Sequence, residues 1–150
     1  MQFVSGEKRK MNPLNETELA WSAGFFDGEG NIRFGNQLRV SGNRSRTYGS
    51  IRLQIAQVDK YVLDRFRKAV KNLGSVTGPY ISKQANKKPV YSYTASGSEA
   101  INAFNLIKSY LSPIKLKQGK IAISKDRLQK SRPKLGNGMV QRLRIKSYAT

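Results

Sequence analysis

The sequence predicts an α+β domain in the order α-ββ-α-ββ-α-α, with one four-stranded antiparallel sheet backed by helices. Three observations support this fold class. Residues 48–58 (YGSIRLQIAQV) alternate apolar and polar side chains, as a half-buried strand does. Residues 59–73 carry apolar side chains at helical spacing. Ser112 followed by Pro113 is a common start of a helix.

The first element is expected to be a helix that follows a tail over residues 1–14. Asn15 is a good N-cap, and Glu18 three residues later completes a start resembling a capping box. The apolar pattern continues to about Asp27, and the glycines beyond it stop a helix.

The remaining elements follow from apolar periodicity and turn residues. They are strands at 31–40 and 48–58 around a turn at 41–47, a helix at 59–73, strands at 79–84 and 89–95 around the basic turn ANKK, and helices at 98–110 and 113–130. Residues 15–130 are therefore expected to form one domain, with 131–150 as a basic C-terminal extension.

The composition predicts a polyanionic partner and excludes several chemistries. The chain has 28 Lys and Arg against 9 Asp and Glu, a net charge of +19, and no His or Cys. Such charge favours binding to nucleic acid. Without His or Cys there is no catalytic triad, Cys nucleophile, disulfide or Cys/His zinc site. A metal site must use carboxylates and carbonyls, which favour Mg²⁺, Mn²⁺ or Ca²⁺.

Two features of the sequence bear on where in the cell the protein is expected: the length of its apolar runs and the composition of its N-terminus. No apolar run approaches the roughly 20 residues that span a bilayer, and residues 1–12 lack the apolar core of a secretory signal. We expect an intracellular protein, whose compartment the sequence does not identify.

Two of the scarce acids lie where a stable helix does not favour them. Asp27 and Glu29 fall at the C-terminal end of the first predicted helix, where the helix dipole is negative. A cation bound there would explain them, with the Glu29 carboxylate and the Gly28 carbonyl as ligands. Pairing with nearby Lys or Arg is the alternative.

Small residues form a stripe on the same helix. Ala20, Gly24 and Gly28 are spaced four residues apart, so they share one helical face on which another backbone can approach closely. The stripe either packs on the chain's own sheet or forms a symmetric helix–helix dimer interface, which would bring two copies of Glu29 together.

At this point the residues resemble a known family. Residues 22–30, SAGFFDGEG, are similar to the motif of the LAGLIDADG homing endonucleases, with Ser22 where Leu is usual and Glu29 where Asp is commonest. Residues 53–57 (LQIAQ) resemble the family's strand end with a catalytic-site Gln, and residues 111–118 (LSPIKLKQ) resemble a family helix start. The motif occurs once, as in the class that acts as homodimers.

The resemblance implies a site and a reaction. Glu29 would ligate Mg²⁺ with the Gly28 carbonyl assisting, and Mn²⁺ or Ca²⁺ would substitute in binding. Gln57 would position the water network, and Lys117 would lie near the scissile phosphate. A homodimer would supply two carboxylates and cleave both strands of a long pseudo-palindromic DNA target by metal-dependent hydrolysis.

DNA recognition would use the polar face of the sheet, because Arg and Gln can hydrogen-bond to base edges in the major groove. The first two strands offer Arg33, Gln37, Arg39, Tyr48, Ser50, Arg52 and Gln54; the second hairpin offers Ser82, Gln84 and Ser92; phosphate contacts are expected from Arg44, Arg46, Lys83, Lys87 and Lys88.

Two alternatives stay open. One is a non-cleaving nucleic-acid binder of the same fold, such as an intron maturase or a repressor. The other is an unrelated basic RNA-binding or ribosomal protein, for which charge alone is sufficient.

Overall fold

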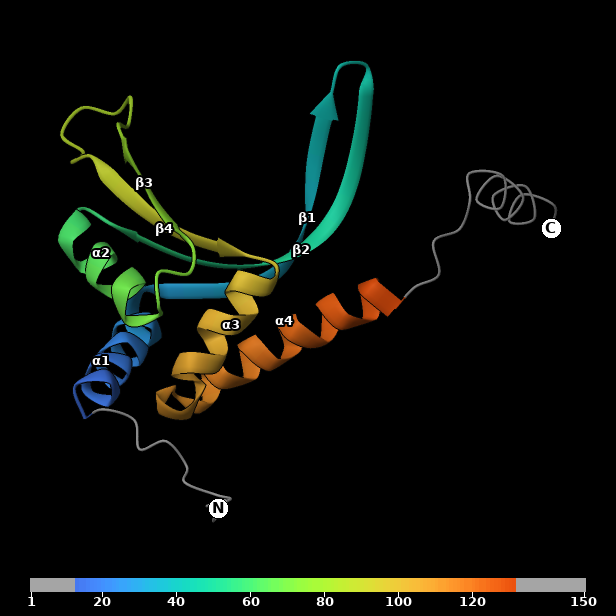
Figure 1. The fold of residues 1–150 in the computed structure, drawn as a ribbon. Coiled ribbons are helices and arrows are strands. Elements are labelled where there is room, and N and C mark those ends of the chain that lie inside the picture. Colours follow the sequence, from blue (N-terminus) through green and yellow to red (C-terminus); the bar gives the residue numbers. More distant parts are fainter. Residues whose placement is uncertain (1–12, 132–150) are drawn as a thin grey trace, which may run out of the picture.

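The computed structural model describes residues 13–131 of the chain (Figure 1). The elements are α1 (Pro13–Glu29), β1 (Gly30–Ser41), β2 (Arg44–Gln57), α2 (Lys60–Ala69), β3 (Ser75–Tyr80), β4 (Val90–Ser96), α3 (Ser98–Ile107), a 3-10 turn η1 (Lys108–Tyr110) and α4 (Pro113–Ser131). This order confirms the predicted α+β fold. Of the predicted tail and C-terminal extension, all but residues 13, 14 and 131 lie outside the described residues.

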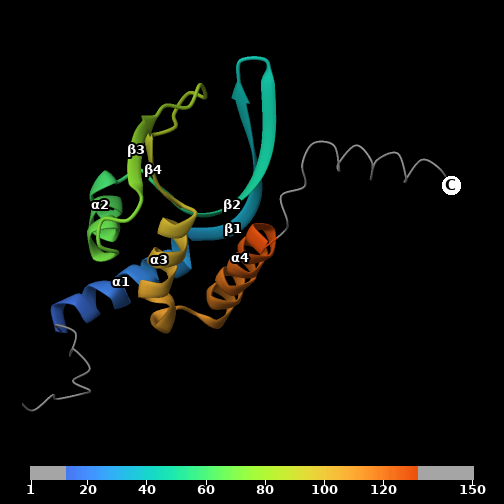
Figure 2. The same cartoon turned by 45° about the vertical axis from the view of Figure 1, so that its right-hand side comes forward.

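The four strands form one antiparallel sheet in the order β1-β2-β4-β3. Figures 1 and 2 show that the sheet curves into a trough, with the helices on its convex side. The β1–β2 hairpin rises at one end of the trough, and β3 with the loop after it rises at the other. We call the concave side, opposite the helices, the open face.

The core lies between the sheet and the helices. Every second residue of β2 contributes to it, because Ile51, Leu53 and Ile55 are buried and alternate with polar residues. Tyr93 of β4 lies at the centre, edge-on to Phe66 of α2 at 4.9 Å between ring centroids. Burial raises the pKa of the Tyr93 hydroxyl, which donates to the Leu73 carbonyl at 2.7 Å. The sheet therefore has one apolar and one polar face.

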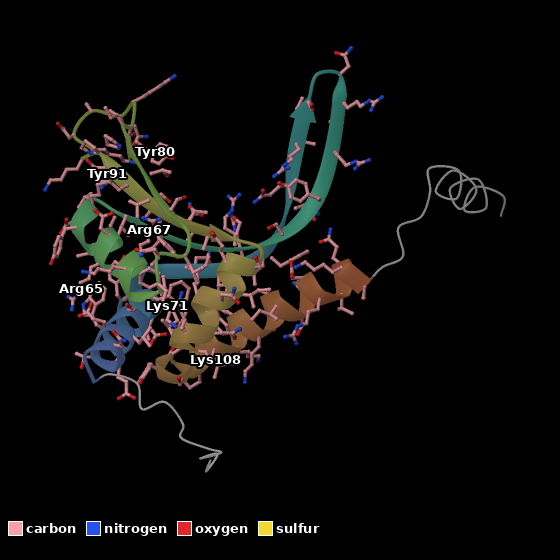
Figure 3. The ribbon with its side chains drawn as sticks, in the orientation of Figure 1. Arg65, Arg67, Lys71, Tyr80, Tyr91 and Lys108 are labelled. Carbon is pink, nitrogen blue, oxygen red and sulfur yellow. The ribbon has the colours of Figure 1, made fainter. Side chains whose placement is uncertain are left out.

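The α1 helix buries only one of its sides. Leu19, Ala23 and Phe26 face the core, together with Ser22, whose hydroxyl has no partner within residues 13–131. On α2, Arg65 (Figure 3) joins the two helices, because its guanidinium pairs with Glu18 of α1 at 2.8 Å. No helix in the described part of the chain is long and apolar enough to cross a membrane.

The predicted limits of the first hairpin are wrong. The strands continue through the expected turn at 41–47 and close in two residues, with Ser41 opposite Arg44. Gly42 has φ +58°, which glycine adopts without strain in a two-residue hairpin turn. β2 therefore extends well past β4, which pairs only with residues 52–57 of β2.

The C-terminal half of α4 supports the extended part of β2. The side-chain amide of Gln129 is oriented so that it bonds to both backbone groups of Gly49. It donates to the Gly49 carbonyl at 3.3 Å and accepts from the Gly49 N–H at 2.9 Å. A Cβ at Gly49 would lie within 2.3 Å of both Gln129 and Phe34, so this close approach requires glycine.

Other predicted boundaries shift as well. α1 begins at Pro13 rather than at an Asn15 cap, since proline suits the first helical turn. α2 is capped by Asp59 and ends before Lys71, which has φ +59° and cannot continue a helix. β3 occupies 75–80 instead of 79–84, because Val76 pairs with Tyr93 on the apolar face. Residues 81–89 form an exposed loop.

Candidate functional site

The register of β1 and β2 places the predicted recognition residues of these strands on the open face. The residues directly opposite each other are Asn31 and Gln54, Arg33 and Arg52, Gly35 and Ser50, Gln37 and Tyr48, Arg39 and Arg46, and Ser41 and Arg44. Figure 3 shows nitrogen-bearing side chains along this hairpin.

Two of these cross-strand pairs join like charges. Arg33 lies opposite Arg52, and Arg39 lies opposite Arg46. Like charges in this position destabilise a sheet. The Nε of Arg52 is also buried without a hydrogen-bond partner within residues 13–131. An anion on the open face would offset this repulsion and satisfy the free donor.

Tyr48 holds two neighbouring side chains in place. Its hydroxyl donates to Oε1 of Gln37 at 3.2 Å. The Arg39 guanidinium lies over its ring, 4.9 Å from the centroid. The sequence predicted all three residues as DNA contacts but not their pairing, because Gln37 lies opposite Tyr48 only in the register that the strands adopt.

The β3–β4 part of the open face carries hydroxyl groups instead of charges. Ser75 lies opposite Thr94, and Thr77 lies opposite Ser92. Ser92, a predicted DNA contact, is 8% exposed, and its Oγ accepts from Gln54 Nε2 at 3.3 Å. Ser92 therefore orients the side chain of Gln54 through this hydrogen bond. The hydroxyls of Ser75, Thr77 and Thr94 were missed.

The basic residues of the second hairpin lie in a loop. The other five predicted contacts of this hairpin are exposed between β3 and β4. Lys87 and Lys88 were expected in the connecting turn, whereas Ser82, Lys83 and Gln84 were expected in a strand and lie in the loop instead. The Ser82 hydroxyl accepts from the Gln84 N–H at 3.2 Å. The loop presents three lysines above one end of the trough.

Glu29 is the last residue of α1 and is exposed. Within residues 13–131, every acid except Glu16 and Glu29 has a hydrogen-bond or ion-pair partner; the pairs are Glu18–Arg65, Asp27–Ser112, Asp59–Tyr61, Asp64–Lys60, Glu99–Gly74 and Asp126–Lys130. Glu16 lies in the first turn of α1, where the helix dipole favours an acid. In this part of the chain, Glu29 alone has neither a partner nor a favourable helix end.

Asp27 has a structural role, and its interpretation as a misplaced acid is wrong. Its carboxylate accepts from the Ser112 N–H at 3.1 Å and from the Ser112 hydroxyl at 2.9 Å. Ser112 precedes α4, so the acid at the end of α1 is also at the favourable N-terminal end of α4.

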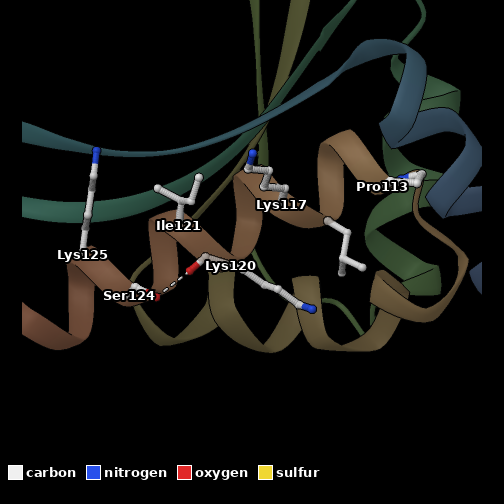
Figure 4. Close-up of a pocket in the computed structure, with 7 residues that line it drawn as sticks. Pro113, Lys117, Lys120, Ile121, Ser124 and Lys125 are labelled. Carbon is white, nitrogen blue, oxygen red and sulfur yellow. Dashed lines mark hydrogen bonds between the residues drawn. The ribbon is translucent and has the colours of Figure 1, made fainter.

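The first turn of α4 makes a second contact with the end of α1. Lys115 Nζ donates to the carbonyl of Gly30. Lys117 follows on the same helix and is exposed, and Figure 4 shows it pointing toward the strands while Lys120 points away. Gln57 ends β2 and is partly exposed. No hydrogen bond or ion pair joins Glu29, Gln57 and Lys117 within the described residues.

The small-residue stripe of α1 is free of the chain's own sheet. Ala20, Gly24 and Gly28 are all exposed. A Cβ built on Gly24 or Gly28 would meet nothing within 4 Å. The alternative that this stripe packs on the sheet is therefore wrong for the described residues.

The donor set at the end of α1 fits part of a hard-cation site. The carboxylate of Glu29 and the carbonyl groups of the helix end are oxygen ligands of the type that Mg²⁺ or Ca²⁺ takes. Residues 13–131 contain no group of three or more acids, His or Cys that could hold a metal. One copy of the chain thus supplies half of a carboxylate pair at most.

A family model described as a LAGLIDADG-like domain matches residues 16–108, more than half of the chain. In a comparison with curated protein sequences, no significant match is found.

Solved structures of LAGLIDADG proteins have the same fold. The homing endonuclease I-CvuI in complex with its target is 18% identical with a TM-score of 0.58; the match covers 80% of this chain and 72% of that one. An archaeal intron-encoded homing endonuclease, I-Vdi141I, complexed with DNA, is 16% identical with a TM-score of 0.54, covering 75% and 68%. Group I intron-encoded I-CeuI, also complexed with DNA, is 12% identical with a TM-score of 0.51, covering 75% and 55%.

Proposed function

We propose that this chain, which belongs to the LAGLIDADG family, is a homodimeric, divalent-metal-dependent endonuclease that cuts both strands of DNA at a specific, pseudo-palindromic site. The observation that carries the proposal is Glu29. It is an exposed acid without a structural partner in residues 13–131, at the end of a helix that leads directly into an arginine-rich strand. A carboxylate repels phosphates on a surface that only binds them, and a cation held there would account for its position.

The exposed stripe of α1 supports the homodimer. Ala20, Gly24 and Gly28 allow the same helix of a second copy to approach closely around a two-fold axis. Gly28 ends the stripe and Glu29 is the next residue, so this packing would bring the two Glu29 carboxylates close together. Dimerisation then completes a carboxylate pair that a single copy lacks.

The open face supports DNA as the substrate. Arginines on β1 and β2 lie side by side without acidic neighbours on that face, and the major groove admits a two-stranded ribbon. The similar structures of I-CvuI and I-Vdi141I are complexes with its target and with DNA, respectively. We assign Arg33, Gln37, Arg39, Ser50, Arg52 and Gln54 to base or phosphate contacts, and Arg44, Arg46, Lys83, Lys87 and Lys88 to phosphates.

Each catalytic side chain has a defined task. Glu29, with the Gly28 carbonyl, holds the metal, which when bound activates water and neutralises charge on phosphate oxygens. I-CvuI has been crystallised with its target in the presence of Ca, and with an I-CreI target, not cleaved, in the presence of Mg. Lys117 offsets the charge that develops on the phosphate. Gln57 hydrogen-bonds and orients the attacking water.

The test is the variant Glu29→Gln, which keeps the size of the side chain and removes its charge. With a randomised duplex library and Mg²⁺, we expect the wild-type chain to cut and the cut ends to sequence as one pseudo-palindrome. Loss of a metal ligand worth several kcal/mol should slow cleavage at least about 1,000-fold. DNA affinity should stay within about threefold, because the phosphate contacts remain.

Glu16→Gln is the matched control, because Glu16 is also an unpaired, exposed acid on α1. It should cut like the wild type. Cleavage by the Glu29→Gln variant at the wild-type rate would remove Glu29 from the site. Binding without cutting by the wild-type chain would instead identify a non-cleaving binder of the same fold.

A further inference from the structure

We propose that Ser112 and Lys115 are positioning residues, which hold the first turn of α4 against the two sides of Glu29 and thereby set Lys117 relative to that carboxylate. We call Asp27, Gly30, Ser112 and Lys115 the α1–α4 clip. The inference rests on the proposed function, because it assigns a role in that same site to residues that touch neither metal nor DNA.

The first half of the clip lies before Glu29 in the chain. The Asp27 carboxylate accepts from the Ser112 N–H at 3.1 Å to each oxygen and from the Ser112 hydroxyl at 2.9 Å. The same hydroxyl accepts from the Lys115 N–H at 3.4 Å, which is long for a hydrogen bond. The Ser112 hydroxyl therefore makes its shorter hydrogen bond to Asp27 of α1 and its longer one to the backbone of α4. A residue that only capped α4 would not need the hydrogen bond to α1.

The second half of the clip lies after Glu29. Lys115 Nζ donates to the Gly30 carbonyl and lies 5.6 Å from the centre of the Phe26 ring. Gly30 is itself pressed against that ring, because a Cβ at this position would lie 1.9 Å from Phe26 Cδ2. Gly30 therefore has little freedom to move.

The two halves bracket a short exposed segment. Asp27 and Gly30 are held by these contacts, whereas Gly28 and Glu29 between them are exposed, and a Cβ on Gly28 would meet nothing within 4 Å. The backbone of Glu29 is held while its carboxylate stays free, which is the arrangement a metal ligand needs. Lys117 lies two residues beyond Lys115 on the same helix. The clip therefore holds both the backbone of Glu29 and the helical turn that carries Lys117.

The kinetic test is a double-mutant cycle between Ser112→Ala and Lys117→Ala on the duplex recovered from the library. Alone, Ser112→Ala should lower the single-turnover cleavage rate about tenfold, the size expected for losing one hydrogen bond to a charged group, with DNA affinity unchanged. In the Lys117→Ala background it should add less than about twofold, because it acts through Lys117. If Ser112 only stabilised the fold, the fold-reductions in cleavage rate caused by Ser112→Ala and Lys117→Ala would multiply in the double variant.

Ser124→Ala is the matched control. Ser124 is an exposed serine on α4 whose hydroxyl donates at 2.9 Å to the Lys120 carbonyl of its own helix. It should leave cleavage unchanged. Lys115→Met, which keeps the aliphatic stem and loses the donor to Gly30, should repeat the non-additive pattern with Lys117→Ala. Full additivity for both clip variants, or an equal effect of Ser124→Ala, would overturn the inference.

Amide hydrogen exchange tests the clip without any cleavage. In Ser112→Ala, the amides of residues 28–31 should exchange about tenfold faster while those of β2 do not change, because only a local contact is lost. If the wild-type chain cuts no DNA, the proposed function fails and this measurement still decides whether the clip exists. Unchanged exchange in both clip variants would reject the clip even for an active nuclease.

Discussion

The two hairpins of this sheet share one open face and differ in how they present charge. The β1–β2 hairpin carries its charge on the strands, where Arg33 and Arg39 lie directly opposite Arg52 and Arg46. The β3–β4 hairpin has hydroxyl residues on its strands, with Ser75 opposite Thr94, and its charge lies in the loop beyond them.

The difference suggests a division of labour in DNA binding. Guanidinium groups fixed on strands have a defined register and can read base edges, whereas lysines on a loop act as point charges for phosphates. Hydroxyl groups can donate or accept and discriminate bases weakly. On this view the first hairpin sets sequence specificity and the second mainly adds affinity.

The largest effect is expected from Arg33→Ala with Arg52→Ala, which breaks the charged cross-strand pair. If both arginines make bidentate base contacts, affinity for the preferred duplex should fall at least about 100-fold. Titration of a labelled duplex measures it. The matched control is Ser75→Ala with Thr94→Ala, the corresponding pair of the other hairpin, which should change affinity less than about threefold. Equal losses for the two pairs would remove the distinction between the hairpins.

A smaller effect is expected from Lys87→Ala with Lys88→Ala in the loop. Loss of two phosphate contacts should weaken binding about tenfold for every sequence alike and lower the slope of log K against log salt by about 2. Affinity is measured on preferred and scrambled duplexes over a series of salt concentrations. A selective loss on the preferred duplex would show that this loop reads bases.

The smallest effect is expected from Tyr48→Phe, which removes one hydroxyl and keeps the ring under Arg39. Without the hydrogen bond from Tyr48, the Gln37 amide is free to rotate, so discrimination at the base pair it reads should fall about fivefold. Sequencing of bound DNA from a randomised pool measures this. Affinity for scrambled DNA should not change, and a loss there would assign Tyr48 to a phosphate contact.

Much of this surface could be predicted because a strand has a period of two. Arg33, Gln37 and Arg39 share the parity of Glu29, and Ser50, Arg52 and Gln54 alternate with a buried aliphatic row, so their common face follows once strands are assigned. The Arg44–Arg46 segment was assigned to a turn because no apolar alternation marks a hairpin that projects from the core.

The role of Asp27 could not be found from the sequence. Its partner, Ser112, lies 85 residues further along the chain, and nothing local to Asp27 indicates it. From the sequence alone, Asp27 and Glu29 therefore looked equally unfavourable at the C-terminal end of α1. The fold separates them, because one caps another helix and the other remains free.

β3 was misplaced for a different reason. Tyr80 and Ile81 suggested an apolar strand at 79–84, yet they are 57% and 77% exposed. β3 pairs with β4 further upstream, where Val76 lies opposite Tyr93. The register of this pairing then shifts between Thr77 and Tyr80. A bulge of this kind breaks the alternation on which strand prediction depends.

The part of β2 that extends past β4 has an unpaired edge, which bears on the tendency of the protein to aggregate. An exposed strand edge is a template on which other chains can add strands and aggregate. Here Gln129 occupies the edge at Gly49, and the far end carries Arg44 and Arg46, whose mutual repulsion between molecules disfavours such growth. The arginines assigned to DNA thus also protect the edge, and variants that neutralise them trade weaker binding for a greater tendency to aggregate.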